Sequence, residues 1–260
     1  MFEMLAIPFM RQALLAGLLL AVVLAYLGVH VVRRRIVFVD LAIAQLSAVG
    51  VALAVWLERE PVFFSLGFTL AGAALLSVPG RNRRVPQEAV MGAVYAVASA
   101  LVILLMAASP HGDAELLGLL FGNILAVTDE RIRLLALLLF GVGCSHFFWR
   151  RFLDLSANDD RPWRWDLLFY LALALVIATA IRTAGVLVVF SDLVIPAIAA
   201  VLLADRFIWQ VCWAVAVSVA ANVTGLYVSY RYDLPAGSSI VAALGGWLLL
   251  IWIVRRAIKM

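Results

Sequence analysis

Long apolar runs separated by short polar segments fill the chain from one end to the other. A transmembrane helix needs about 20 mainly apolar residues, because each residue rises about 1.5 Å and the hydrocarbon core of a bilayer is about 30 Å thick. Nine stretches approach this length, and they are 13–32, 36–57, 62–79, 89–108, 132–149, 167–181, 183–203, 207–230 and 238–254. The pattern predicts an all-α, polytopic transmembrane bundle of about nine spans, or eight if 183–203 does not cross.

A shorter apolar segment, 116–127, lies between the fourth and fifth of these stretches. It is too short to span a bilayer comfortably, and Gly118, Gly122 and Asn123 interrupt it. We expect a re-entrant or half-buried segment at this place.

Composition supports a membrane protein and excludes a soluble one. The 260 residues are 66% hydrophobic and 14% charged, whereas a soluble domain is roughly 45 to 50% apolar and about 25% charged. The first run has no small-residue cleavage site and ends in three arginines at 33–35, so we interpret it as a transmembrane helix and not as a cleaved signal. Without repeats or long linkers, residues 1–260 are predicted to form a single transmembrane domain.

The basic residues indicate topology. They cluster at the ends of apolar runs and not along one helix face, so the net charge of +4 does not indicate nucleic-acid binding. In the nine-span model, 14 of the 20 Lys and Arg residues fall on one side, which the positive-inside rule assigns to the cytoplasm. The N-terminus is then outside and the C-terminus inside a plasma (inner) membrane, with tryptophans near the span ends in contact with membrane lipid.

The chain lacks the motif that would let it hydrolyse ATP. No Gly-rich phosphate loop followed by Lys and Ser or Thr occurs in it, so nucleotide energy would come from a partner chain. Cys144 and Cys212 lie inside apolar runs and indicate neither a disulfide framework nor a thiolate metal cluster. We therefore expect a chain that is not an enzyme and binds no cofactor of its own.

Acidic residues near the spans are candidate functional groups, since a charge at mid-bilayer costs at least about 2.5 kcal/mol. Asp40 begins the second span after the arginine cluster, with Gln45 further along, and Glu88 begins the fourth. Each carboxylate has two possible roles. It could line a transport path, or it could pair with nearby arginines and favour a helix N-terminus.

Histidines offer weaker candidates. His111 and Glu115 lie close together in a loop on the outer side, where imidazole and carboxylate could ligate a divalent metal or simply be solvated. His30 and His146 are single residues on apolar helices and are expected to be packed or interfacial.

Polar residues and a proline also interrupt the seventh run. Ser191, Asp192 and Pro196 lie within it, so we expect Pro196 to break the helix, giving a packed bend or a partner-docking element. The run continues to Asp205 and Arg206. Its candidate apolar anchors are Leu193, Ile195, Ile198 and Leu202.

Five segments in order along the chain resemble those of the metal-importing permeases of ATP-binding-cassette systems for zinc, manganese or iron. They are Arg33 to Arg35 with Phe38, Asp40 and the run to Gly50; Glu88 with Gly92; 120–128; 185–196; and Tyr230, Tyr232, Asp233, Pro235, Ala236 and Gly237. Zinc-importing members carry helix histidines where this chain has Gln45, and Tyr95 with Ala96.

The resemblance implies a type II importer fold and a division of labour among subunits. Two copies would form the path, an extracytoplasmic binding protein would deliver a divalent metal ion, and cytoplasmic ATPase subunits would dock on 192–206. The path or metal contacts expected on this resemblance are Asp40, Gln45, Glu88, Tyr95, His111 and Glu115.

Two other classes stay open on the residues alone. A secondary transporter would show an internal inverted repeat, which is not visible. An intramembrane enzyme would need a close acid pair or a nucleophile with a base, and neither is apparent.

Overall fold

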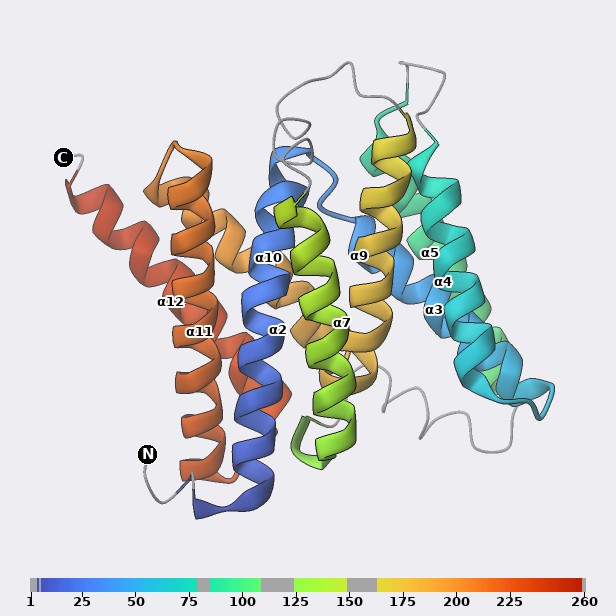
Figure 1. Cartoon of the computed structure of the whole chain (residues 1–260), viewed down its shortest axis with the longest axis horizontal. Helices are drawn as coiled ribbons and strands as arrows, with labels where there is room; N and C mark the ends of the chain where they lie inside the picture. Colours follow the sequence, from blue (N-terminus) through green and yellow to red (C-terminus); the bar gives the residue numbers. More distant parts are fainter. Residues whose placement is uncertain (1–3, 5, 79–84, 109–123, 149–162, 259–260) are drawn as a thin grey trace.

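The computed structural model describes residues 4, 6–78, 85–108, 124–148 and 163–258, and within them every regular element is helical. The α-helices of this part are α2 (Pro8–Arg33), α3 (Val39–Trp56), α4 (Pro61–Ser77), α5 (Gln87–Ala107), α7 (Asp129–Phe148), α9 (Trp163–Ala184), α10 (Val186–Leu203), α11 (Phe207–Tyr232) and α12 (Ala236–Ile258). The start of α2 and the end of α12 lie at opposite ends of the bundle (Figure 1).

Each predicted apolar stretch falls on one of these helices, so the all-α prediction is confirmed. Within the described residues, seven helices are long and apolar enough to cross a membrane. The other two are α4, which is shorter at 17 residues, and α7, whose first turn carries Asp129 and Glu130. The structure therefore supports a polytopic bundle. In the described part, nine α-helices correspond to the nine predicted stretches, but seven of them have the length and hydropathy of a membrane span.

The short segment 116–127 is described only from residue 124 onward. Its end forms η1 (Ile124–Ala126), one turn of 3-10 helix that packs against α2. The predicted interruption of the apolar run by Gly118, Gly122 and Asn123 lies outside the described residues.

The bundle has two groups of helices. α3 packs with α4 and α5, while α2 packs with α10 and α11, and α12 covers α10 and α11. α9 contacts both groups, and Figure 1 shows it standing between them. α9 therefore links the two groups.

Glycines permit two of the closest backbone approaches. A Cβ at Gly28 in α2 would overlap the carbonyl group of Leu193 in α10, and a Cβ at Gly225 in α11 would lie 2.6 Å from Cα of Ile240 in α12. Small residues at such crossings let helices pack tightly without a hydrophobic driving force between them. The first contact fixes α10 against α2, and the second fixes α11 against α12.

The prediction that Pro196 breaks the seventh span is wrong. α10 runs without interruption from Val186 to Leu203 with Pro196 inside it. Proline removes one helix hydrogen bond, here the one to the carbonyl of Asp192, and packed neighbouring helices make that loss tolerable. The chain turns instead at Gly185, whose φ of 84° joins α9 directly to α10.

Candidate functional site

Asp40 is a buried carboxylate in the first turn of α3. It is 2% exposed, and its Oδ1 accepts the backbone N–H of Leu41 at 2.8 Å. Among the described residues no ion pair reaches it, because Arg34, from the preceding arginine cluster, pairs with Asp166 instead. Arg34 is therefore not the ion-pair partner of Asp40 that the arginine cluster suggested.

Glu88 approaches the same region from α5. Its Oε1 accepts a long hydrogen bond of 3.4 Å from the backbone N–H of Val37, in the connection between α2 and α3. Glu88 is half-buried, and Val37 precedes Asp40 by three residues. The fold thus gathers the acidic first turns of α3 and α5 at one end of the bundle.

The other predicted path residues are distributed differently. Gln45 is buried in α3, whereas Tyr95 in α5 is 37% exposed. His111 and Glu115 lie outside the described residues. Within the described part, no group of three or more His, Cys, Asp or Glu side chains could enclose a metal ion.

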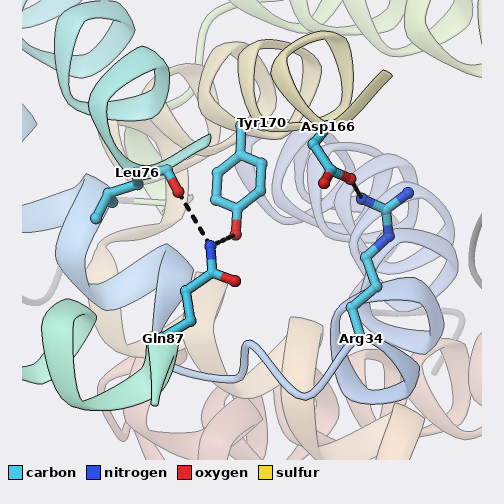
Figure 2. Close-up of polar contacts among 5 residues, drawn as sticks. All are labelled: Arg34, Leu76, Gln87, Asp166 and Tyr170. Atoms are coloured by element: carbon cyan, nitrogen blue, oxygen red, sulfur yellow. Dashed lines mark hydrogen bonds and ion pairs between the residues drawn. The ribbon is translucent and has the colours of Figure 1, made fainter. Parts of the chain in front are cut away.

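A polar cluster that sequence reasoning missed surrounds the start of α9. We call Arg34, Leu76, Gln87, Asp166 and Tyr170 the α9 clasp (Figure 2). Arg34 Nη1 lies 3.0 Å from Asp166 Oδ1, and Gln87 Nε2 donates to the Tyr170 hydroxyl at 2.8 Å and to the Leu76 carbonyl at 3.1 Å. The guanidinium carbon of Arg34 also lies 3.9 Å from the centre of the Phe169 ring.

The α9 clasp joins four helices at one end of the bundle. Its members come from the ends of α2, α4, α5 and α9, and Gln87 immediately precedes Glu88. The clasp therefore holds the first turn of α5, which carries Glu88. Polar residues near span ends were the available sequence signal, but nothing in their spacing indicates partners 83 residues apart.

A second polar cluster lies in the interior, around Asp192. This side chain is fully buried, and Oδ1 accepts hydrogen bonds from Ser218 Oγ at 2.7 Å and from Asn222 Nδ2 at 2.9 Å. Nδ2 also lies 3.1 Å from Oδ2. Asp192 thus joins α10 to α11, which matches the packed alternative for this residue.

The predicted docking segment divides into an inner and an outer part. Leu193 is fully buried and Ile195 is half-buried. Ile198 is 38% exposed, Leu202 is half-buried, and Asp205 and Arg206 are exposed where α10 gives way to α11. The outer part alone is accessible from outside the bundle.

His30 is packed, as expected for a single histidine on an apolar helix. It is 1% exposed, with its ring centre 5.0 Å from that of Tyr26 and 4.9 Å from that of Phe207. The side chain of His146 is not among those that the structure describes.

Two solved structures have folds similar to that of this chain. The similarity to PsaBC from Streptococcus pneumoniae in complex with Fab has a TM-score of 0.81 and covers 96% of this chain and 94% of that chain, at 23% identity. An inward-facing conformation of a putative metal-chelate type ABC transporter matches with a TM-score of 0.73, covering 93% and 85% at 16% identity.

Curated relatives extend over most of the chain. The manganese transport system membrane protein MntC of Halalkalibacterium halodurans is 28% identical over 92% of this chain and 85% of its own length. The high-affinity zinc uptake system membrane protein ZnuB of Haemophilus influenzae is 25% identical, over 88% and 91%. A family model described as the ABC 3 transport family matches residues 6–255. The chain therefore belongs to the ABC 3 transport family.

Proposed function

We propose that this chain is the permease subunit of an ATP-driven importer of a divalent metal ion, with zinc, manganese and iron as the candidates. The observation that carries the proposal is Asp40, a carboxylate that is 2% exposed in an apolar bundle. An intramembrane carboxylate is costly to keep, and such groups mark ion pathways. The family membership and the names of the relatives supply the class of cargo.

Asp40, Gln45 and Glu88 are the proposed metal contacts toward the cytoplasmic end of the path. All three offer oxygen atoms, and carboxylate and carbonyl oxygens suit manganese better than zinc, for which imidazole is a frequent ligand. Manganese is therefore the cargo that this set favours. Tyr95, His111 and Glu115 remain proposed contacts, with His111 and Glu115 nearer the outer end, where the ion would enter.

The proposed assembly places a second copy against α5. This helix carries Glu88, and only 22% of its apolar window is buried within one chain. Val97, Ile103 and Leu104 are 62%, 60% and 68% exposed on it. Covering this face with a second copy would enclose the acidic end of α5 and place the path between the two chains.

A separate ATPase is proposed to act from the cytoplasm, with the N-terminus of this chain outside and its C-terminus inside. The outer part of the docking segment, which includes Ile198, Leu202, Asp205 and Arg206, is the proposed ATPase contact. Its exposure and its place at the end of α10 support this assignment. An extracytoplasmic protein would deliver the metal to the opposite face.

Metal uptake by Asp40→Asn and Glu88→Gln variants tests the proposal. Each substitution preserves shape and removes a charge, so we expect uptake to fall at least about tenfold, as when groups that support a metal ligand are lost. Glu60→Gln is the matched control, because Glu60 is an exposed acid before α4 and makes no side-chain cap.

Expression in the membrane and uptake of radioactive manganese and zinc are measured for all three variants. Wild-type uptake by both Asp40→Asn and Glu88→Gln would show that these acids are structural and do not contact the metal. A stronger loss for zinc than for manganese would contradict the preference for manganese.

A further inference from the structure

An apolar groove of about 1010 Å³ opens on the outside of the bundle between α2 and α7. Leu15 and Val22 line it from α2, and Leu137, Phe140 and Gly143 line it from α7. Leu137 and Phe140 are 71% and 73% exposed, so this surface is open within one chain. A hollow of this size facing the hydrocarbon of a bilayer requires an apolar occupant.

The length of the groove corresponds to one leaflet. Along α7 it extends from Arg133 to Cys144, which is about 16 Å at 1.5 Å per residue. This is close to half of the hydrocarbon thickness of about 30 Å. A lipid chain that enters beside Arg133 would therefore reach the middle of the membrane at Cys144.

One end of the groove is charged. Arg133 lines both the groove and an adjoining cavity of about 480 Å³, whose polar lining also includes Thr128, Glu130 and Arg131. Arginine is well suited to phosphate because its planar donors bind two oxygens at once. Arg133 could thus bind the phosphate of a phospholipid while the adjoining apolar groove holds one of its acyl chains.

The start of α2 adds a further positive charge to this end. Gln12 Nε2 donates to Asp129 Oδ1 at 2.8 Å, which holds the first turns of α2 and α7 together. Arg11 is exposed, and it precedes Leu15 by four residues and so lies on the helix face that lines the groove. Among the described residues, Arg11, Arg131 and Arg133 outnumber the acids Asp129 and Glu130, which gives this part of the mouth a positive charge.

We propose that this groove binds an anionic phospholipid of the phosphatidylglycerol class. The phosphate lies against Arg133 and Arg131, and an acyl chain fills the space between α2 and α7. The positive mouth and the depth of one leaflet favour lipid over a second copy of the chain, for which the exposed face of α5 is the separate candidate.

Two glycines of α7 provide a matched pair of variants. Gly143 lines the groove and Gly141 does not, and a Cβ built at either position meets no atom within 4 Å. Leucine at either position also improves helix propensity by a similar amount. Gly143→Leu therefore places a side chain inside the groove and narrows it, whereas Gly141→Leu makes the same chemical change two residues away.

Native mass spectrometry of the full-length chain in mild detergent counts bound lipid after addition of phosphatidylglycerol or phosphatidylcholine with identical chains. We expect Gly143→Leu to lose the bound lipid and Gly141→Leu to keep it. Arg133→Gln should weaken phosphatidylglycerol about fivefold and leave phosphatidylcholine unchanged, since one interfacial arginine contributes about that factor.

The same spectra report the oligomeric state. Lipid retained at the wild-type level by Gly143→Leu would overturn the proposal. So would a loss of dimer in Gly143→Leu with no change in lipid, which would assign the groove to a second copy. Equal binding of both lipids by the parent chain would overturn the role of Arg133. These readouts need neither metal nor ATP, so they are independent of the transport function proposed above.

Discussion

The Asp192 cluster gives a prediction whose size can be derived from its contacts. Asp192→Leu replaces a fully buried carboxylate by an apolar side chain and removes the acceptor for Ser218 and Asn222. Ser218 can turn its hydroxyl to the carbonyl one turn earlier in α11, as serines in helices do. Asn222 keeps its bond to the Ser218 carbonyl at 3.0 Å but loses the contact between helices.

Interhelical hydrogen bonds in membrane proteins contribute about 0.6 kcal/mol on average and at most about 1.7 kcal/mol. With two donors losing their acceptor, we expect Asp192→Leu to lower the free energy of unfolding by about 1 to 3 kcal/mol. A double-mutant cycle with Asn222→Leu isolates the Asp192–Asn222 interaction, and we expect a coupling of about 0.6 kcal/mol or more.

The assay is the unfolding free energy of the purified chain in mixed micelles of increasing SDS content. Ser99→Ala is the control, because Ser99 is in α5 and bonds only to the Tyr95 carbonyl of its own helix. It should change stability by less than about 0.5 kcal/mol. A strictly additive double mutant, or Asp192→Leu with the stability of the parent, would refute the role of this cluster in joining α10 to α11.

Three further predictions concern topology, the clasp and coupling. In a cysteine-free background, a cysteine within 81–84 should react with impermeant reagents only from the cytoplasm. A cysteine near Ala236, at the exposed Leu234, should react only from outside. Reversed labelling would invert the proposed orientation. Tyr170→Phe removes the acceptor for Gln87 and should destabilise the bundle by about 0.5 to 1.5 kcal/mol in the same SDS assay, and an unchanged midpoint would contradict the clasp. Ile198→Glu should release the ATPase in a pull-down from solubilised membranes, while the permease is still found in the membrane. Full retention of the ATPase by this variant would contradict the assignment of Ile198 to the ATPase contact.

Much of the fold was predictable because the bilayer imposes a local rule. Every backbone polar group in hydrocarbon must be satisfied within its own segment, so a long apolar run becomes a helix whatever it packs against. The stretches predicted from hydropathy accordingly coincide with α-helices of the described chain. The ordered motifs from Arg33 to Gly237 likewise indicated the family that the model match over 6–255 establishes.

Contacts between helices were not predictable by the same route, because they depend on which faces meet. The arginine cluster next to Asp40 suggested an ion pair in sequence, yet Arg34 pairs with Asp166, 132 residues away. Nothing in the sequence pairs Gln87 with Tyr170, because their hydrogen bond forms only where the start of α5 meets α9 in the folded chain.

The sequence by itself determined that this is a helical membrane bundle, where the helices fall, and the family. Only the tertiary structure decided that α10 continues through Pro196, because packing against α2 and α11 compensates for one missing hydrogen bond. It also decided that Asp192 faces the interior and Ile198 the outside, since burial is set by the helices that surround a face. A local pattern can specify a helix, but the partner of each polar side chain is a property of the assembled bundle.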